Sequence, residues 1–352
     1  MNKVIIPVGY MGSGSSAITD LLCEVEGYDS VNGSFEYVLM HCPNGIFDLE
    51  DKLLRGNNAL RSDEALHSFY DCMKTLFYCK RFGVGDYKHR VSPHFLEECE
   101  KYIGELITEK NENCYWYYQE TPNKIMIMKK AFNKLIYLIS FKTIRSKPVL
   151  KYNEMWVAYP SKEEFYTASK RFLNTFFYEL KIDKQNLILD QFLLPHNLWR
   201  FKNYFDDNSK VIVVDRDPRD VFLLNKYYWK KAGFPLPYSC DVVDFCEHYK
   251  KMRQCEIIEK NENILRIHFE DLVYKYDETV RSIFKFLNIE EYQHSMKKTK
   301  FIPQKSMKNT QLFNRKSEYK IEGQYIEEHL SEYLYEFPVN ECEEFFMNDI
   351  IL

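Results

Sequence analysis

The first stretch that suggests chemistry is a turn rich in glycine and serine near the N-terminus. Residues 9–16 read GYMGSGSS and fit the phosphate-loop frame G-x-x-x-x-G-K-[ST], except that Ser15 stands where the lysine is expected. Glycines let successive backbone N–H groups converge on an anion, and the N-terminus of a following helix adds about half a positive charge. The alternative is a tight turn without a ligand. The predicted ligands are the backbone and hydroxyl groups of Gly12, Ser13, Gly14, Ser15, Ser16 and Ala17.

A second candidate anion site is a basic turn in the second half of the chain. The apolar run 211–214 is followed by the sequence DRDPRD and then by a helical pattern. The carboxyl ends of parallel strands form the binding crevice of an open α/β sheet, so we expect Arg216 beside the first turn. Its guanidinium suits bidentate recognition of phosphate, although the neighbouring charged residues could instead pair among themselves and cap a helix. Two such features at one sheet edge favour a nucleotide with separated phosphates.

The elements that must position these residues follow from the hydrophobic pattern. Continuous rather than alternating apolar runs are typical of parallel strands that are covered on both faces. Helical patterns alternate with these runs, which predicts an α/β fold, three-layered α/β/α with a central parallel sheet, as in phosphate-loop NTPases. The predicted strands are residues 4–8, 28–31, 187–189, 211–214 and 264–267, and the helical patterns include 197–205, 221–231, 242–259 and 278–287.

Residues 48–184 break this alternation. They are polar, aromatic and mostly helix-like, so we interpret them as a helical insertion into a single domain, residues 1–352, and as a cap that binds the acceptor. Within the insertion, residues 125–141 are strongly apolar. We expect a core helix of the insertion there rather than a helix on a membrane surface, because the cationic face is thin.

Composition limits the classes of function. The 352 residues carry a net charge of −4, which disfavours binding to nucleic acid or an anionic membrane by bulk charge. Hydrophobic residues make up 45% of the chain, enough for a sizeable core. The ten cysteines include no C-x-x-C pair, which argues against a zinc ribbon and suits reduced thiols. We therefore expect a cytoplasmic protein without a signal peptide or a transmembrane helix.

Three stretches together resemble the sulfotransferase family that uses 3′-phosphoadenosine 5′-phosphosulfate (PAPS). Residues 9–17 resemble its 5′-phosphosulfate loop, and residues 211–221 resemble its 3′-phosphate motif, a strand followed by R-[DN]-P-[RK]-D-V. Residues 264–272, ILRIHFEDL, and a following helix that ends KFLNI resemble its late strand, YEDL turn and helix ending FLG. The matches occur in the family's order, over about residues 1–45 and 185–300. The resemblance implies a bacterial carbohydrate-type member.

Two positions depart from the family's pattern. The family usually carries Lys or Arg at the position of Gly12, where that cation contacts the bridging oxygen of the donor. The cations that could replace it are Arg61, Arg55 and Lys52. The family also has a serine eight residues after its phosphate-binding arginine. Leu224 occupies this position, and the nearest polar substitute is Asn225, which we expect to help Arg216 hold the 3′-phosphate.

Glu36 is the predicted general base. It follows the second predicted strand, where the glycan and tyrosine branches of the family often place an acidic residue. Removal of the acceptor's hydroxyl proton by such a group is worth about 10²–10⁴-fold in rate. His41 and His67 are the second choices, since an unperturbed histidine titrates near neutrality, with core or surface roles as the alternative. Asp190, at the tip of the third sheet strand, is expected either to contact the acceptor or only to cap a helix.

Two basic residues near the C-terminus complete the predicted donor site. The family closes its nucleotide pocket with a basic segment there, often RKG, and Arg315 and Lys316 match it except that Ser317 follows. A solvated basic loop is the alternative for this pair.

These residues together predict transfer of a sulfuryl group from PAPS to an acceptor hydroxyl. The expected acceptor is a glycan or a lipid-linked sugar. Because a sulfuryl group carries less negative charge than a phosphoryl group, no metal is expected. Two alternatives stay open. One is a phosphate-loop kinase, which the missing lysine disfavours. The other is a catalytically degenerate nucleotide-binding scaffold in polysaccharide assembly.

Overall fold

The computed structural model describes residues 3–30, 35–80, 84–112, 124–140, 149–152, 154–180 and 186–338. The chain divides into two units, which are described separately. Unit 1 comprises Met1–Val38 and Ile182–Leu352, and unit 2 comprises Leu39–Lys181. The insertion predicted at residues 48–184 overlaps unit 2, and its bounds as an insertion into a single domain stay a prediction. Its expected role as an acceptor-binding cap stays a prediction.

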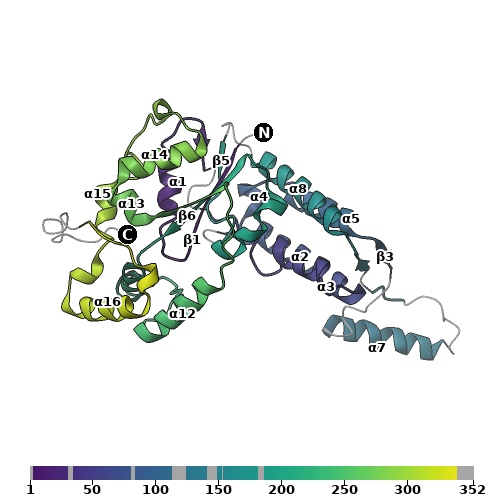
Figure 1. Cartoon of the computed structure of the whole chain (residues 1–352). Helices are drawn as coiled ribbons and strands as arrows, with labels where there is room; N and C mark the ends of the chain where they lie inside the picture. Colours follow the sequence, from purple (N-terminus) through teal and green to yellow (C-terminus); the bar gives the residue numbers. More distant parts are fainter. Residues whose placement is uncertain are drawn as a thin grey trace. The chain divides into compact units, whose positions relative to one another are not determined.

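A five-stranded parallel sheet forms the centre of unit 1 (Figure 1). Its strand order is β2–β5–β1–β6–β7, and every neighbouring pair is parallel. The middle strand β1 is buried along its whole length, as its continuous apolar run predicts. The strands are β1 (Val4–Gly9), β2 (Tyr28–Asp29), β5 (Asn186–Ile188), β6 (Ser209–Asp215) and β7 (Ile264–His268).

The register of the sheet decides which turns meet. Gly9, the last residue of β1, pairs with Val214 of β6. Asp215, the last residue of β6, pairs with His268 of β7. The turns after β1, β6 and β7 therefore leave the sheet at one edge, its carboxyl edge, where ligands bind in open α/β sheets.

Two groups of helices flank this sheet. Figure 1 shows α1, α13 and α14 on one side of it and α12 and α16 on the other. On the first side, the apolar face of α1 packs with α14 and with sheet residues such as Ile212. On the other, Phe222 and Phe245 belong to a second apolar cluster. The helices are α1 (Ser16–Leu22), α9 (Phe201–Tyr204), α10 (Pro218–Leu223), α11 (Lys230–Ala232), α12 (Val242–Gln254), α13 (Phe269–Tyr274), α14 (Tyr276–Leu287), α15 (Pro303–Met307) and α16 (Ser317–His329).

Short helical turns connect these elements. A π-helix, η2 (Leu224–Trp229), continues α10, so the helix predicted at 221–231 is not a regular α-helix. The helix predicted at 242–259 ends earlier, at Gln254. The 3₁₀ turns are η1 (Pro195–Arg200), η3 (Glu291–Gln293), η4 (Leu312–Asn314) and η5 (Ser331–Tyr333). The predicted α/β fold with a central parallel sheet is confirmed.

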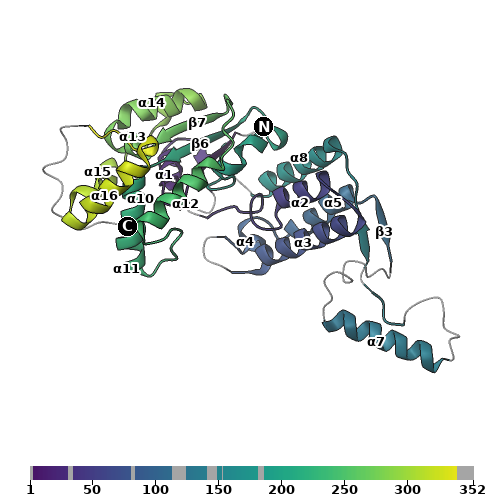
Figure 2. The same ribbon diagram turned by 60° about the horizontal axis from the view of Figure 1, so that its bottom comes forward.

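Unit 2 is mainly helical (Figure 2). Stacked and edge-to-face rings fill its core, among them Tyr102 and Phe172, whose ring centroids lie 4.9 Å apart. The helix α8 begins with a capping box, in which Ser161 and Glu164 satisfy each other's backbone N–H groups. Its helices are α2 (Ile46–Leu54), α3 (Ala59–Tyr78), α4 (Tyr87–Arg90), α5 (Phe95–Leu106), α7 (Lys124–Ile139) and α8 (Lys162–Glu179), and its strands β3 (Glu109–Asn111) and β4 (Met155–Val157) pair antiparallel.

One prediction for unit 2 is wrong. The apolar stretch at 125–141 is not a core helix, because Met126 is the single buried residue of α7 within the described part of the chain. None of the described helices is long and apolar enough to cross a membrane.

Candidate active site

The turn after β1 has the backbone that its glycines predict. Gly12 and Gly14 have φ angles of +84° and +85°, a region that side-chain-bearing residues rarely adopt. The Ser13 N–H donates to the Tyr10 carbonyl at 2.9 Å and closes the turn. The Ser13 side chain is 2% exposed, and its Oγ has no hydrogen-bond partner among the described residues. A Cβ on Gly9 would lie 2.0 Å from this Oγ, so glycine is needed there as well.

Two aromatic rings cover the turn. A Cβ added at Gly12 would lie 2.8 Å from Cη2 of Trp229, and one added at Gly14 would lie 2.9 Å from Cδ2 of Phe269. Trp229 ends the π-helix η2, and Phe269 begins α13. The missing cation at position 12 therefore has a structural reason, because the indole occupies the space into which a side chain at this position would extend.

Gly12→Ala is expected to lower the free energy of unfolding by about 1–3 kcal/mol, because it adds both backbone strain and a ring clash. Gly27→Ala is the matched control, since Gly27 has a φ of +82° and no atom within 4 Å of an added Cβ. The control should show only the conformational part, about 1 kcal/mol. Urea unfolding of both variants measures the difference. Equal losses would show that Trp229 does not confine position 12.

Arg216 joins the turn to the C-terminal part of unit 1. It directly follows β6 and is 6% exposed. Its Nη1 donates to the Gly12 carbonyl at 3.0 Å, and its Nη2 donates to the Asn309 carbonyl. The guanidinium carbon lies 4.6 Å from the centroid of the Phe269 ring. The two features that the sequence marked as anion sites thus touch each other.

Buried carboxylates surround this arginine. Asp217, Asp220 and Glu270 are all fully buried. Glu270 accepts the Asp217 N–H at 2.9 Å, and Asp220 accepts the N–H groups of Gln311 and Leu312 at 2.8 and 2.7 Å. Burial, the largest cause, raises the pKa of Asp220 and of Glu270, and the positive charge of Arg216 opposes the rise. The carboxylates therefore tie the segment near residue 311 to α10.

A network of charges anchors the start of the turn. The Tyr10 hydroxyl donates to Glu256, and the guanidinium of Arg253 lies 4.3 Å from the centroid of the Tyr10 ring. Asp215, at the end of β6, forms ion pairs with Arg253 at 3.0 Å and with Arg266 at 3.6 Å. The turn is thus fixed to the ends of β6 and β7 on the side away from α1.

A pair of carboxylates lies beside the turn. The Tyr37 N–H donates to the Asp190 carbonyl at 3.4 Å, which places Glu36 next to Asp190. Burial raises the pKa of the Asp190 carboxyl to about 7, with a further rise from the charge of Glu36, while a hydrogen bond from Ser15 opposes it. Partial desolvation also raises the pKa of Glu36, whose side chain keeps access to solvent. Gln191 donates to the Ser15 hydroxyl at 2.8 Å and has a φ of +53°, a strained backbone of the kind found at functional sites.

The raised pKa of Asp190 predicts a pH-dependent stability. In the unfolded chain an Asp titrates near 3.9, so the folded state favours the protonated carboxyl. The advantage of the folded state is complete below pH ~4 and is lost as the pH rises toward 7. Asp190→Asn removes this titration. The free energy of unfolding of the variant, minus that of the unmodified chain, should therefore rise by roughly 1–4 kcal/mol from pH 4 to pH 8. Urea unfolding across this range, with the exposed Asp207→Asn as the control, tests it; parallel pH profiles would exclude a buried proton at Asp190.

Asn225 has partners other than the expected phosphate. Its side chain is fully buried, its Nδ2 donates to the Tyr238 carbonyl at 3.0 Å, and its Oδ1 accepts the Tyr238 N–H at 3.4 Å. The Tyr238 hydroxyl in turn donates to the Met11 carbonyl at 3.1 Å. The structure thus gives Asn225 the task of positioning Tyr238 against the turn, because both ends of its amide are engaged.

The C-terminal basic pair, Arg315 and Lys316, follows the segment that Arg216 contacts at the Asn309 carbonyl. Arg315 donates to the Lys308 carbonyl, next to the Asn309 carbonyl that Arg216 uses. Lys316 is exposed and lies 5.0 Å from the centroid of the Tyr319 ring. The position of Arg315 is compatible with a donor site beside Arg216, and the role of both residues stays a prediction.

The remaining predicted residues belong to unit 2. Arg61 and Arg55 are exposed on and before α3, and Arg61 donates to the Lys52 carbonyl at 3.2 Å. Lys52 pairs with a glutamate of α3 at 2.9 Å. His67 stacks on a tryptophan ring, with centroids 4.0 Å apart, and His41 is half-buried. Their approach to the turn of unit 1, as cations or as proton carriers, stays a prediction.

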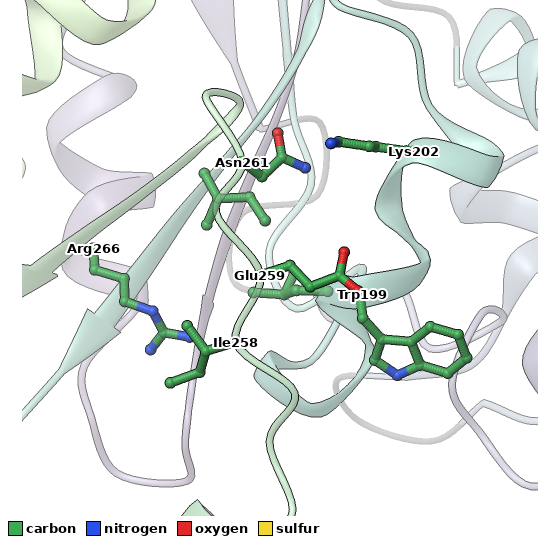
Figure 3. A pocket seen from close by; sticks show the side chains of 8 residues that line it. Trp199, Lys202, Ile258, Glu259, Asn261 and Arg266 are labelled. Atoms are coloured by element: carbon green, nitrogen blue, oxygen red, sulfur yellow. The ribbon is translucent and has the colours of Figure 1, made fainter.

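A separate hollow in unit 1 is too small for a substrate. Its volume of about 20 Å³ is that of a single water molecule. Figure 3 shows the side chains that line it: Trp199, Lys202, Ile258, Glu259, Asn261 and Arg266. Over the described ranges, His, Cys, Asp and Glu side chains form no group of three or more that could hold a metal ion.

Residues that the sequence patterns do not mark as functional shape the turn. Phe269 and Glu270 stand directly after β7, at the carboxyl edge of the sheet, and this position was a usable signal. Trp229 and Tyr238 belong to no motif. They follow the turn by more than 200 residues in the sequence, so only folding brings them to it.

Comparison with known proteins finds a family model that matches part of the chain. Residues 146–294 match the model described as the Sulfotransferase family. No curated protein matches the sequence. Among solved structures, a sulfotransferase domain from the curacin biosynthetic pathway is 14% identical, with 96% of this chain and 99% of that chain covered and a TM-score of 0.38. Sulfotransferase STF9 from Mycobacterium avium is 10% identical over 94% and 76% of the two chains, with a TM-score of 0.36. Retinol dehydratase, solved with androsterone and the inactive cofactor PAP, is 12% identical over 84% and 62%, with a TM-score of 0.27. These TM-scores are too low to add weight to the family match.

Proposed function

We infer, since the chain belongs to the sulfotransferase family, that it transfers a sulfuryl group from PAPS to a hydroxyl of a glycan or a lipid-linked sugar. The observation that carries the choice of donor is the contact between Arg216 and Gly12, 3.0 Å between Nη1 and the carbonyl oxygen. A nucleotide with phosphates at both its 5′ and 3′ positions needs two anion sites within one molecule's length. The turn and the arginine supply such a pair.

Unsatisfied buried groups support the fit of this donor. Ser13 Oγ and Arg216 Nε are buried and have no hydrogen-bond partner among the described residues. Buried polar groups in folded proteins nearly always have partners, and those without one often await a ligand. A hydroxyl and a guanidinium N–H are both donors suited to phosphate or sulfate oxygens.

The proposed division of labour follows from these positions. PAPS supplies an activated sulfuryl group when it is bound. The amides and hydroxyls of residues 12–17 hold its 5′ end, and Arg216, with Arg315 and Lys316, holds its 3′-phosphate. Trp229 limits the room over Gly12. Positioning of the acceptor oxygen and stabilisation of developing charge by fixed N–H dipoles then supply most of the rate.

Glu36 is the proposed base. Its carboxylate keeps access to solvent, so an acceptor hydroxyl can reach it. Desolvation raises its pKa, which makes it a stronger proton acceptor than an ordinary Glu. The buried Asp190 lies next to it and accepts a hydrogen bond from Ser15, which links the two carboxyl groups to the turn.

The acceptor class is proposed from exposed aromatic residues of unit 2. The rings of Tyr78, Tyr159 and Tyr178 are each exposed there. Aromatic faces pack well against the apolar faces of sugar rings, so we propose that one or more of these rings binds a glycan or the sugar of a lipid-linked precursor. A cytoplasmic site of action goes with such precursors.

Calorimetry separates this function from its rivals. The chain is titrated with adenosine 3′,5′-bisphosphate and, in parallel, with ATP and Mg²⁺, and the bisphosphate titration is repeated with EDTA. We expect preferential binding of the bisphosphate, unchanged by EDTA. Preference for ATP would reject the donor assignment and favour a kinase. Incubation with ³⁵S-labelled PAPS and a panel of glycans and lipid-linked sugars then identifies the acceptor; bisphosphate binding without transfer to any member would favour a non-enzymatic scaffold.

A further inference from the structure

The helix α7 presents its apolar side to solvent. Helical spacing puts most of its large apolar side chains on one arc and Lys129, Lys130, Asn133 and Lys134 on the opposite arc. Seven of these apolar side chains are 43–70% exposed. They are Ile125, Ile127, Met128, Phe132, Leu135, Leu138 and Ile139. An amphipathic helix of a water-soluble domain normally has the reverse orientation.

Polar contacts hold the helix in this orientation. Asn133 Nδ2 donates to the Leu150 carbonyl at 2.9 Å, and Asn133 Oδ1 accepts the Leu150 N–H at 2.8 Å. One helical turn before Asn133, Lys129 donates to the Lys151 carbonyl at 3.0 Å. Because its polar side is bonded to the segment 149–151, the apolar side of α7 faces away from that segment.

The charge of residues 124–151 indicates which kind of surface could cover the apolar side of α7. Between Lys124 and Lys151 the sequence has seven lysines, one arginine and no acidic residue, in a chain whose net charge is −4. Four of these lysines lie on α7 itself. A second copy of the chain would bring the same cationic surface against this one, which is unfavourable. An anionic surface that accepts apolar side chains satisfies both features, and a membrane with acidic lipids is such a surface.

We propose that α7 binds the surface of an anionic membrane. Its apolar arc enters the boundary between headgroups and acyl chains, and its lysines contact lipid phosphates. The helix α7 has 16 residues and is about 24 Å long. Within the described residues no helix, α7 included, is able to cross a bilayer. It therefore lies in the plane of the surface. This proposal does not depend on the proposed sulfuryl transfer.

Vesicle flotation with the full chain tests the proposal. The vesicles are phosphatidylcholine alone or phosphatidylcholine with phosphatidylglycerol. We expect binding to the acidic vesicles at least tenfold tighter than to the neutral ones, and weaker binding at high salt. Leu135→Glu should reduce binding at least tenfold. Ile321→Glu, which places the same charge on an exposed apolar position of α16, should leave it unchanged.

Two further measurements keep the result interpretable. Lys130→Gln with Lys134→Gln should weaken binding to acidic vesicles while the circular dichroism and the urea midpoint stay constant. Phe132→Trp should give a blue-shifted emission only with acidic vesicles, as a buried indole does. Equal binding to both vesicle types, equal binding of the Leu135→Glu and Ile321→Glu variants, or a dimer that Leu135→Glu abolishes without any vesicle binding would each overturn the proposal.

Discussion

Glu36→Gln is expected to lower the rate constant of sulfuryl transfer by about 10²–10⁴-fold, the usual contribution of a general base. The amide has nearly the shape of the carboxylate but cannot accept the proton of the acceptor hydroxyl. Because Glu36 lies beside Asp190 and outside the turn at residues 12–17, the affinity for adenosine 3′,5′-bisphosphate should change less than twofold. Single-turnover transfer from labelled PAPS, to the acceptor found in the panel, and calorimetry measure the two quantities.

The pH profile gives a second check on Glu36. Since desolvation raises its pKa, the acid limb of kcat/KM should lie above the value near 4.3 of an ordinary Glu. This limb should be absent from the residual activity of Glu36→Gln. The control is Glu26→Gln, an exposed carboxylate of unit 1 that should keep full activity. Turnover of Glu36→Gln close to that of the control would reject Glu36 as the base.

Arg216→Ala is expected to weaken binding of adenosine 3′,5′-bisphosphate by about 1.5–3 kcal/mol, which corresponds to roughly 10–150-fold in Kd. This range is that of a hydrogen bond to a charged group. The substitution also removes the donor to the Gly12 carbonyl, so the turn loses its link to the segment near residue 309. Calorimetry at a temperature well below the unfolding transition measures the Kd of the folded variant.

The buried surroundings of Arg216 call for a matched control. Arg219→Gln removes another buried arginine of the same turn, whose partner Asp217 lies 2.7 Å away. Its side chain donates to Asp217 and Glu327, and within the described residues it makes no hydrogen bond to residues 9–16 or 308–309. We expect Arg219→Gln to lower stability and leave the Kd of the folded protein within twofold. Equal losses of affinity in both variants would mean that Arg216 acts through stability and does not hold a phosphate.

The sequence was sufficient for the strands of the sheet in unit 1 and for the edge at which the two predicted anion sites meet. Runs such as 211–214 are continuous in Val and Ile, which is typical of strands covered on both faces, and the strands form at these places. The glycines at 12 and 14 predicted a turn that converges on an anion, and both adopt positive φ. Parallel strands then place Arg216 at the same edge. Local sequence decides these features because each depends on a residue type and its immediate neighbours.

The residues that cover the turn at 9–16 could not be predicted from local sequence. Trp229 reaches Gly12 through the π-helix after α10, and no local pattern announces a π-helix there. The hydrogen bonds between the Asn225 amide and the backbone of Tyr238 could likewise not be predicted, and the role of Asn225 at a 3′-phosphate stays a prediction. Such contacts join residues far apart in sequence, so their geometry exists only after the chain has folded.

The helix α7 shows most clearly which features the sequence decides and which the tertiary structure decides. The chain's periodicity by itself determined that residues 124–139 form a helix with one apolar and one cationic side, since that follows from spacing alone. Which side meets solvent was decided by the tertiary structure, through the hydrogen bonds of Asn133 with Leu150. Amphipathicity fixes the two faces of a helix but not the partner of each, because the partner is set by what the rest of the fold brings near.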